Sequence, residues 1–175
     1  MDIANRCRPI ELILSDVDGV LTDGGVIFDN QGIEIKRFHI RDGLGIKLWQ
    51  RAGHHFGLIT GRASHIVQLR AVELGVDIVR QGIDEKLPAV KQILAERKLQ
   101  PEQVCYVGDD LPDLPVLRYV GLSVGVGDGC EDLLHSVHYV TRSHGGRGAL
   151  REVVELILKA QGRWDDVLQK YGSSK

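Results

Sequence analysis

The chain alternates short apolar runs with helical patterns, and this alternation limits its fold more than any other feature. The runs ELILSDV, HFGLIT, VDIVRQG, EQVCYVGDD and GLSVGVG have the length and composition of buried strands. Helical patterns at 45–53, 64–75, 84–99 and 148–162 lie between or after them. This order predicts an α/β fold, namely a Rossmann-like doubly wound sheet of mainly parallel strands with helices on both faces.

One segment interrupts the alternation. Residues 24–43 hold two strand-like runs, GVIF and IEIKRFHI, on either side of DNQG, which predicts a β-hairpin at 24–42 inserted after the first strand. Ile33, Ile35 and Phe38 are too apolar for a free flap, and an isolated hairpin is marginal in water. We therefore expect the domain body or another subunit to cover it. The rest of the chain predicts a single domain, 1–175, with tails at 1–8 and 169–175.

Carboxylates stand at the end of the first strand. Asp16 and Asp18 directly follow the apolar run LIL and a serine, where a carboxylate is costly to desolvate without a partner. Three predicted strands end in polar groups, SDVD, LITGR and VGDD. Ligands bind at the carboxyl ends of the strands in such sheets. The pattern indicates a metal site or a proton transfer, although a turn that merely begins with aspartates remains an alternative.

Composition excludes several classes of function. A formal net charge of -2 argues against a nucleic-acid footprint or a polybasic membrane patch, and no apolar run approaches the length of a membrane span. Cys7, Cys105 and Cys130 are an odd number at wide spacing, which suits neither a disulfide framework nor a zinc site. The first residues lack an apolar signal segment. We expect a cytoplasmic protein.

Four motifs in chain order resemble those of the haloacid dehalogenase superfamily of phosphatases: DVDGV, LITGR, the lysine of QGIDEKLPAV, and GDDLPD. With the hairpin, RDGLGIKLW and GGRGALREVVELILKAQG, the chain is similar over 10–161 to the capless branch that includes the 3-deoxy-D-manno-octulosonate 8-phosphate (KDO 8-phosphate) phosphatases. The resemblance implies the superfamily's fold. It also implies homotetramers, in which the hairpins form a central barrel and help to close neighbouring active sites.

The resemblance also implies a two-step hydrolysis of a phosphate monoester. A carboxylate attacks phosphorus to give an aspartyl-phosphate, and a second carboxylate protonates the leaving oxygen and then activates water. A hard cation with oxygen ligands, Mg²⁺, neutralises charge. The implied roles are Asp16 as nucleophile, Asp18 as general acid and base, Thr60 and Lys86 as phosphoryl contacts, and Asp16, the Asp18 carbonyl and Asp109 as metal ligands. Asp113 orients Lys86 or the metal-bound waters, and Asp110 is an alternative ligand.

Substrate contacts follow from family similarity. A sugar acid also carries a carboxylate, which arginine recognises well because it can bind in a bidentate fork. The implied contacts are Asp18, His39, Ile40, Arg41, Asp42, Gly43, Lys47, Arg62, Arg70 and Lys86, with Arg147 a further candidate. Arg62 favours KDO 8-phosphate over the nine-carbon KDN 9-phosphate, because phosphatases for the latter have an acidic residue at this position.

Two other classes remain as alternatives. One is a non-catalytic HAD-like regulatory domain, against which the intact motif residues argue. The other is a phospho-accepting receiver, which lacks both the second aspartate of the DxD motif and the hairpin. The sequence thus predicts a Mg²⁺-dependent phosphatase that makes free KDO for lipopolysaccharide synthesis.

Overall fold

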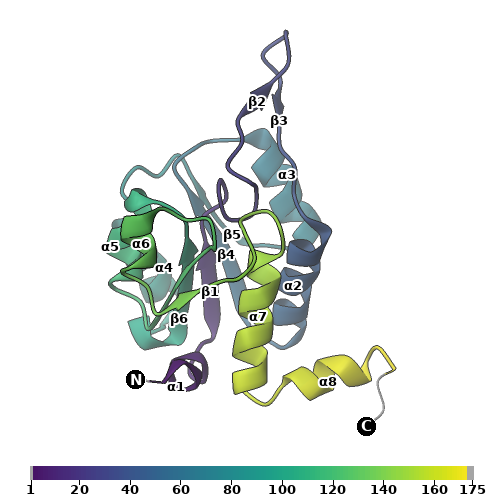
Figure 1. Ribbon diagram of the computed structural model, residues 1–175, viewed down its shortest axis with the longest axis vertical. Helices are drawn as coiled ribbons and strands as arrows, with labels where there is room; N and C mark the ends of the chain where they lie inside the picture. Colours follow the sequence, from purple (N-terminus) through teal and green to yellow (C-terminus); the bar gives the residue numbers. More distant parts are fainter. Residues whose placement is uncertain (1, 173–175) are drawn as a thin grey trace.

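The computed structural model describes residues 2–172, which form a six-stranded parallel sheet between two layers of helices (Figure 1). The strand order is β5-β4-β1-β6-β7-β8, and every pair in it is parallel. The strands are β1 (Leu12–Ser15), β4 (His55–Thr60), β5 (Ile78–Gln81), β6 (Val104–Gly108), β7 (Leu122–Gly125) and β8 (Tyr139–Val140). The predicted doubly wound α/β fold is confirmed. The strand order reverses beside β1, which is where such sheets bind ligands.

The central strand shows why helices cover both faces. Ile13 of β1 belongs to one apolar cluster, whereas its neighbours Leu12 and Leu14 belong to the other, because successive side chains of a strand point to opposite faces. The first cluster contains residues of α1 (Ile3–Cys7), α2 (Ile40–Arg51), α3 (His65–Leu74) and α7 (Ala149–Ala160). The second contains residues of α4 (Lys86–Arg97), α5 (Leu114–Leu117) and α6 (Glu131–Leu134). None of the helices in the described part of the chain is long and apolar enough to cross a bilayer.

Two local predictions need correction. The helix predicted at 45–53 begins earlier, at Ile40, because the His39 ring nitrogen accepts the Arg41 N–H at 3.2 Å and caps it. Within the predicted tail at 1–8, residues Ile3–Cys7 instead form α1, in which Cys7 is completely buried. Of the predicted tail at 169–175, residues 173–175 lie outside the described part of the chain. The sequence reading also missed the short helix α8 (Trp164–Gln169), part of which packs on the core.

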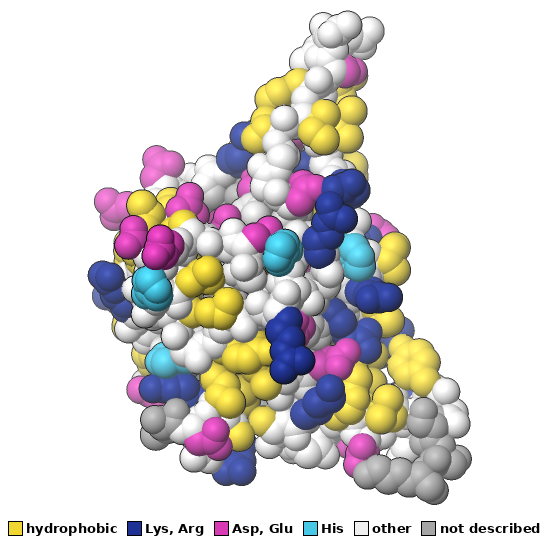
Figure 2. All heavy atoms as spheres, in the orientation of Figure 1, with side chains coloured by type: hydrophobic (Ala, Val, Ile, Leu, Met, Phe, Trp, Pro, Cys, Tyr) yellow, Lys and Arg dark blue, Asp and Glu magenta, His cyan; other side chains and the backbone are white. Residues whose placement is uncertain are grey.

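The predicted hairpin is present and projects from the body of the protein (Figure 1). Its antiparallel strands, β2 (Ile27–Phe28) and β3 (Glu34–Ile35), are shorter than the two apolar runs. Five apolar side chains gather on the projection and are 49–56% exposed: Val26, Ile27, Phe28, Ile33 and Ile35 (Figure 2). Phe38, at the base, packs against the core. The domain body therefore covers the base of the hairpin and leaves its tip open.

Candidate active site

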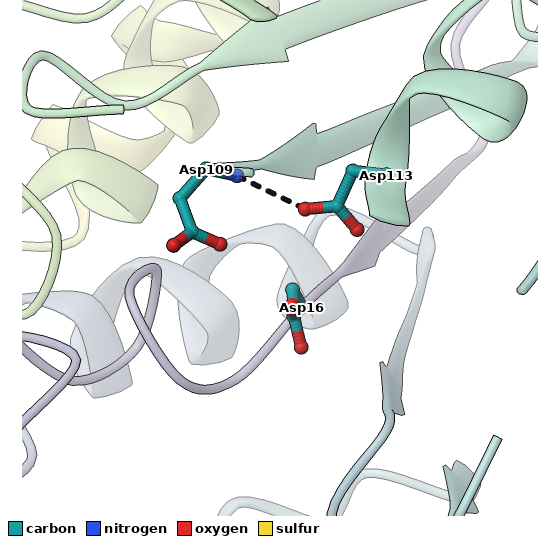
Figure 3. Close-up of side chains that lie close together, drawn as sticks. All are labelled: Asp16, Asp109 and Asp113. Carbon is teal, nitrogen blue, oxygen red and sulfur yellow. Dashed lines mark hydrogen bonds between the residues drawn. The ribbon is translucent and has the colours of Figure 1, made fainter. Parts of the chain in front are cut away.

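Two adjacent strands bring the predicted carboxylates together. Asp16 directly follows β1 and Asp109 directly follows β6, and the two strands pair so that Ser15 lies opposite Val107. Asp113 comes from the short turn of helix after β6, η2 (Leu111–Asp113). One carboxylate oxygen from each of Asp16, Asp109 and Asp113 lies within 4.8 Å of the other two (Figure 3). A single small cation would therefore be within reach of more than one of them.

Lys86 stands between two of these carboxylates. It is the first residue of α4, and its side chain is 3% exposed. Its Nζ lies 2.6 Å from Asp16 Oδ2 and 2.7 Å from Asp113 Oδ1. Burial alone would lower the pKa of Lys86, but the charges of Asp113 and Asp16 and their hydrogen bonds outweigh it, so that the pKa is raised. The lysine is therefore held as a cation beside Asp16.

Both oxygens of Asp113 are already occupied. Oδ1 accepts hydrogen bonds from Lys86 and, at 2.7 Å, from the Tyr106 hydroxyl. Oδ2 accepts the backbone N–H of Asp109 at 3.0 Å. Asp113 thus orients Lys86 and the loop that carries Asp109, and it has little capacity left for a cation.

Asp109 is the opposite case. Among the described residues, none donates a hydrogen bond to its carboxylate. Burial, with the charges of Asp16 and Asp113, raises its pKa to about 7. Burial also raises the pKa of Asp16 to about 6, against the opposing effect of Lys86. The pKa values of both carboxylates are raised even with Lys86 nearby, so that this one cation does not compensate both negative charges. Hard divalent cations bind such oxygen ligands. Asp16 and Asp109 therefore fit a Mg²⁺ ion.

The loop after Asp16 is closed by a residue that the sequence reading passed over. Thr22 Oγ1 accepts the N–H groups of Gly19 and Gly24, each at 3.3 Å, and donates to Asp18 Oδ1 at 3.5 Å. Gly19 has a φ of 87°, and a Cβ there would overlap the Asp109 carboxylate. Only glycine lets the loop pass so close to Asp109.

A pocket of about 320 Å³ opens over these groups. Thr60 is buried at its edge, and its hydroxyl oxygen accepts the Arg62 N–H at 3.4 Å, which leaves the hydroxyl proton free to donate to a ligand. Asp110 caps η2, with its side chain accepting the Leu111 N–H at 2.8 Å. The pocket is lined by Asp16, Asp18, Thr60, Gly61, Arg62, Ile83, Asp84, Lys86, Asp109, Asp110, Pro112 and Asp113. It therefore contains all the predicted catalytic and metal-binding residues.

The base of the hairpin also reaches this site, which the sequence reading did not anticipate. Lys36 pairs with Asp18 Oδ1. Glu34 accepts hydrogen bonds from Arg62 Nη2 at 2.9 Å and from the Ser64 hydroxyl at 2.6 Å. Ser64, the residue before α3, thus directs its hydroxyl to the hairpin and does not cap the helix with it. The alternating pattern of the hairpin gave no signal for which side chains turn back towards their own domain.

The remaining predicted substrate contacts lie elsewhere. His39, Ile40, Arg41, Asp42, Gly43 and Lys47 belong to α2 or its cap, and Arg70 belongs to α3. Among them, Asp42 is buried, with its carboxylate accepting the N–H groups of Gly148 and Arg151 at 3.0 and 3.1 Å. Arg41 and Arg147 line a separate groove of about 630 Å³. Neither Arg147 nor any of the seven predicted contacts on α2 and α3 lines the pocket over Asp16.

Comparisons with known proteins agree with this geometry. A family model for haloacid dehalogenase-like hydrolases matches residues 69–152. The chain is 48% identical to the KDO 8-phosphate phosphatase KdsC of Yersinia pestis, covering 93% of this chain and 87% of the relative. It is 44% identical to KdsC of Escherichia coli K12, covering 94% and 88%. A crystal structure of the Moraxella catarrhalis phosphatase with magnesium, phosphate and KDO has a TM-score of 0.95 at 40% identity and covers 97% of both chains.

Proposed function

The chain belongs to the KDO 8-phosphate phosphatases of the haloacid dehalogenase-like hydrolases, and we propose that it releases phosphate from KDO 8-phosphate through an aspartyl-phosphate on Asp16. The observation that carries the mechanism is the meeting of Asp16, Lys86 and Asp109 in one pocket. The product, free KDO, is a building block for lipopolysaccharide.

Two carboxylates divide the chemistry. In the first step a carboxylate oxygen of Asp16 bonds to phosphorus, the bond from phosphorus to the sugar oxygen breaks, and Asp18 gives that oxygen a proton. In the second step Asp18 takes a proton from water, whose oxygen bonds to phosphorus while the bond to Asp16 breaks. Asp18 lines the pocket two residues beyond Asp16 and is held by Thr22. The second step regenerates both side chains.

The charge of the phosphoryl group is met by fixed donors. Lys86 lies 2.6 Å from Asp16, which brings its positive charge beside the phosphoryl group, and the Thr60 hydroxyl supplies a hydrogen bond. Asp16, Asp109 and the backbone carbonyl of Asp18 would hold Mg²⁺. When bound, the ion supplies positive charge that neutralises the carboxylates and the phosphate. Asp113 keeps Lys86 and the Asp109 loop in place.

Recognition of the sugar acid is assigned to arginines. Arg62 lines the pocket, and its side chain is 44% exposed. Asp42 and Gly43 are buried within their own domain. For the other contacts on α2 and α3, namely His39, Ile40, Arg41, Lys47 and Arg70, we propose that they act in the site of a neighbouring copy. The exposed apolar tip of the hairpin supports this assignment, because patches of this kind mark interaction surfaces. The assembly is then a homotetramer of single-domain chains joined through residues 24–42.

The assembly has its own test. Replacing Phe28 and Ile35 together by serine removes exposed apolar surface without touching the pocket. Light scattering during gel filtration should then report a monomer where the unmodified protein forms a tetramer. A monomeric wild-type protein, or a variant of unchanged mass, would overturn the role of the hairpin. Arg37→Ser, on the same segment, is the matched control.

The substrate is tested by comparing kcat/KM for KDO 8-phosphate and KDN 9-phosphate in the presence of Mg²⁺. A preference for KDO 8-phosphate is expected, because Arg62 stands where an acidic residue would favour the nine-carbon compound. A preference for KDN 9-phosphate would overturn the assignment of KDO 8-phosphate as the substrate, but not the proposed phosphatase mechanism. Failure to hydrolyse either compound would overturn the function itself.

We place the reaction in the cytoplasm. Cys7, Cys105 and Cys130 are all free thiols, as is usual in a reducing compartment. Recovery of the protein from cell fractions tests the assignment, and its appearance in a periplasmic fraction would overturn it.

A further inference from the structure

Lys36 is a buried cation that the mechanism above does not use. It follows β3 at the base of the hairpin, and its side chain is only 1% exposed although the hairpin tip is open. Lysine is rarely buried unless it is paired. Its Nζ forms an ion pair with Asp18 Oδ1 and lies 3.3 Å from Glu34 Oε1. A hairpin residue is therefore in contact with the proposed general acid of its own chain.

Glu34 ties a second cation to the same carboxylate. It accepts a hydrogen bond from Arg62 Nη2 at 2.9 Å, and Arg62 Nε lies 3.8 Å from Asp18 Oδ2. The Ser64 hydroxyl, with Lys36 and Arg62, lowers the pKa of Glu34 and keeps it ionised. Asp18 thus has one cation near each oxygen, and Glu34 contacts both of these cations.

The two cations differ in access to the substrate. The Arg62 side chain lines the pocket and is 44% exposed, whereas the Lys36 side chain does not line it and is 1% exposed. On the basis of the proposed function, we propose that Lys36 is a positioning residue, which holds Oδ1 of Asp18 and so directs Oδ2, the oxygen that carries the proton, towards the leaving oxygen. Glu34 holds Lys36 in turn. The base of the hairpin thereby serves the chemistry of its own chain.

This role has a kinetic signature. An alkoxide leaving group, such as the sugar oxygen of KDO 8-phosphate, needs a proton from a well-placed acid. The phenolate of 4-nitrophenyl phosphate is a good leaving group without one. Because kcat/KM reports the steps up to formation of the aspartyl-phosphate, loss of Lys36 should depress it for the sugar phosphate and spare it for the aryl phosphate.

The experiment measures kcat/KM of Lys36→Met on both substrates. We expect a loss of about 100-fold with KDO 8-phosphate, of the size that follows misplacement of a catalytic group, and no loss with 4-nitrophenyl phosphate. Lys36→Arg should recover part of the loss, because it keeps the charge. Arg37→Met is the matched control, since that neighbour is 66% exposed and pairs with Asp23, and it should change neither rate.

A double-mutant cycle tests the route through Asp18. In an Asp18→Asn background, Lys36→Met should cause no further loss with KDO 8-phosphate. An equal fall on both substrates, no fall on either, or full additivity with Asp18→Asn would overturn the proposal. Glu34→Gln, which keeps the shape of the side chain, gives the same contrast should Lys36→Met fail to fold.

Failure of the proposed function can be distinguished from failure of the proposal for Lys36. A wild-type protein without activity on KDO 8-phosphate overturns that function. In that case glycerol phosphate, another alkyl phosphate, replaces KDO 8-phosphate as the substrate with an alkoxide leaving group. Its kcat/KM is compared with that for 4-nitrophenyl phosphate, so that the role of Lys36 is still tested.

Discussion

The two halves of the proposed site are built differently. In the phosphoryl-transfer half, Asp16 and Asp109 directly follow the adjacent strands β1 and β6. Lys86 begins α4 and Asp113 ends η2, and their side chains are 3% and 1% exposed. The recognition half is spread over α2, α3 and the loop after β4. There the Arg62 side chain is 44% exposed and Ile40 is 79% exposed.

The two halves differ because phosphoryl transfer and substrate recognition make different physical demands. Phosphoryl transfer needs charges held in place before the substrate arrives, because such preorganisation is what stabilises the transition state. A single chain meets that need through the sheet. Recognition of a sugar acid needs an enclosing surface, which the isolated chain leaves open and which we assign in part to a neighbouring copy. Variants in the phosphoryl-transfer half should thus lower the activity on every substrate, whereas variants in the recognition half should lower the activity only on the sugar-acid phosphate.

The largest effect is expected for Asp16→Asn. The amide is not a nucleophile towards phosphorus, so kcat should fall by about 10⁵-fold on KDO 8-phosphate and on an aryl phosphate alike, as it does when other enzymes lose a nucleophile. Steady-state rates on both substrates check it. If the variant keeps a sizeable fraction of either activity, Asp16 is not the nucleophile.

Next in size is Lys86→Met, which leaves Asp16 and Asp113 without their counter-charge. We expect kcat to fall by about 10³-fold on both substrates. Unfolding by denaturant should show a loss of about 3 kcal/mol, because breaking a buried ion pair strands a charge. Lys91→Met is the matched control, since Lys91 belongs to the same helix and lies over the Tyr119 ring at 5.4 Å. If Lys86→Met and Lys91→Met had equal kcat values and equal stability to denaturant, the role given to Lys86 in the phosphoryl-transfer half would be contradicted.

Arg70→Ala tests the recognition half. Loss of a charged contact to the sugar acid should lower kcat/KM for KDO 8-phosphate by about 30-fold and leave the aryl phosphate unaffected. Arg80→Ala, which breaks the surface pair with Glu96, is the control.

Mixing subunits tests whether Arg70 acts in a neighbouring copy. When Asp16→Asn and Arg70→Ala subunits are dissociated and reassembled together, part of the activity on KDO 8-phosphate should return. A fall on both substrates with Arg70→Ala would show that this residue does not act in recognition alone. Absence of recovery would show that it does not act across the interface.

The smallest effect concerns pH and Asp109. The pKa values of Asp16 and Asp109, about 6 and about 7, lie above the ordinary 3.8. A raised carboxylate pKa costs stability once the group must ionise, so that the metal-free protein should lose stability as pH rises from 3.8 to about 7 and stay lower above it. Asp109→Asn removes one such charge. Its melting temperature without metal should exceed that of the wild type by a few degrees on the alkaline side of pH 7.

Magnesium completes this test. It should raise the melting temperature of the wild type more at alkaline than at acidic pH, and that of Asp109→Asn hardly at all. Scanning calorimetry in chelator and in Mg²⁺ measures both. A wild type that is more stable than the variant without metal at alkaline pH would contradict the assignment of the charge.

The meeting of Asp16 and Asp109 could be predicted from the sequence for a physical reason. Parallel strands end at one edge of a sheet, so that carboxylates following two of them must meet, as Asp16 and Asp109 do. The contacts of Lys36 and Glu34 could not be predicted from the sequence, because the alternation of apolar and polar residues in a hairpin does not indicate how its base folds back onto the domain. Asp42 shows the converse. Its place beside arginine and glycine resembled a substrate motif, whereas its buried carboxylate accepts N–H groups at the start of α7.

The proposed mechanism depends most on Asp16 carrying the phosphoryl group. Protein mixed with KDO 8-phosphate and Mg²⁺ can be quenched in acid within a turnover, reduced with borohydride to mark an acyl phosphate, digested, and read by mass spectrometry. We predict a single marked residue, Asp16, and no mark in the Asp16→Asn variant. A mark on another side chain, or turnover without any mark under conditions that preserve acyl phosphates, would contradict the mechanism.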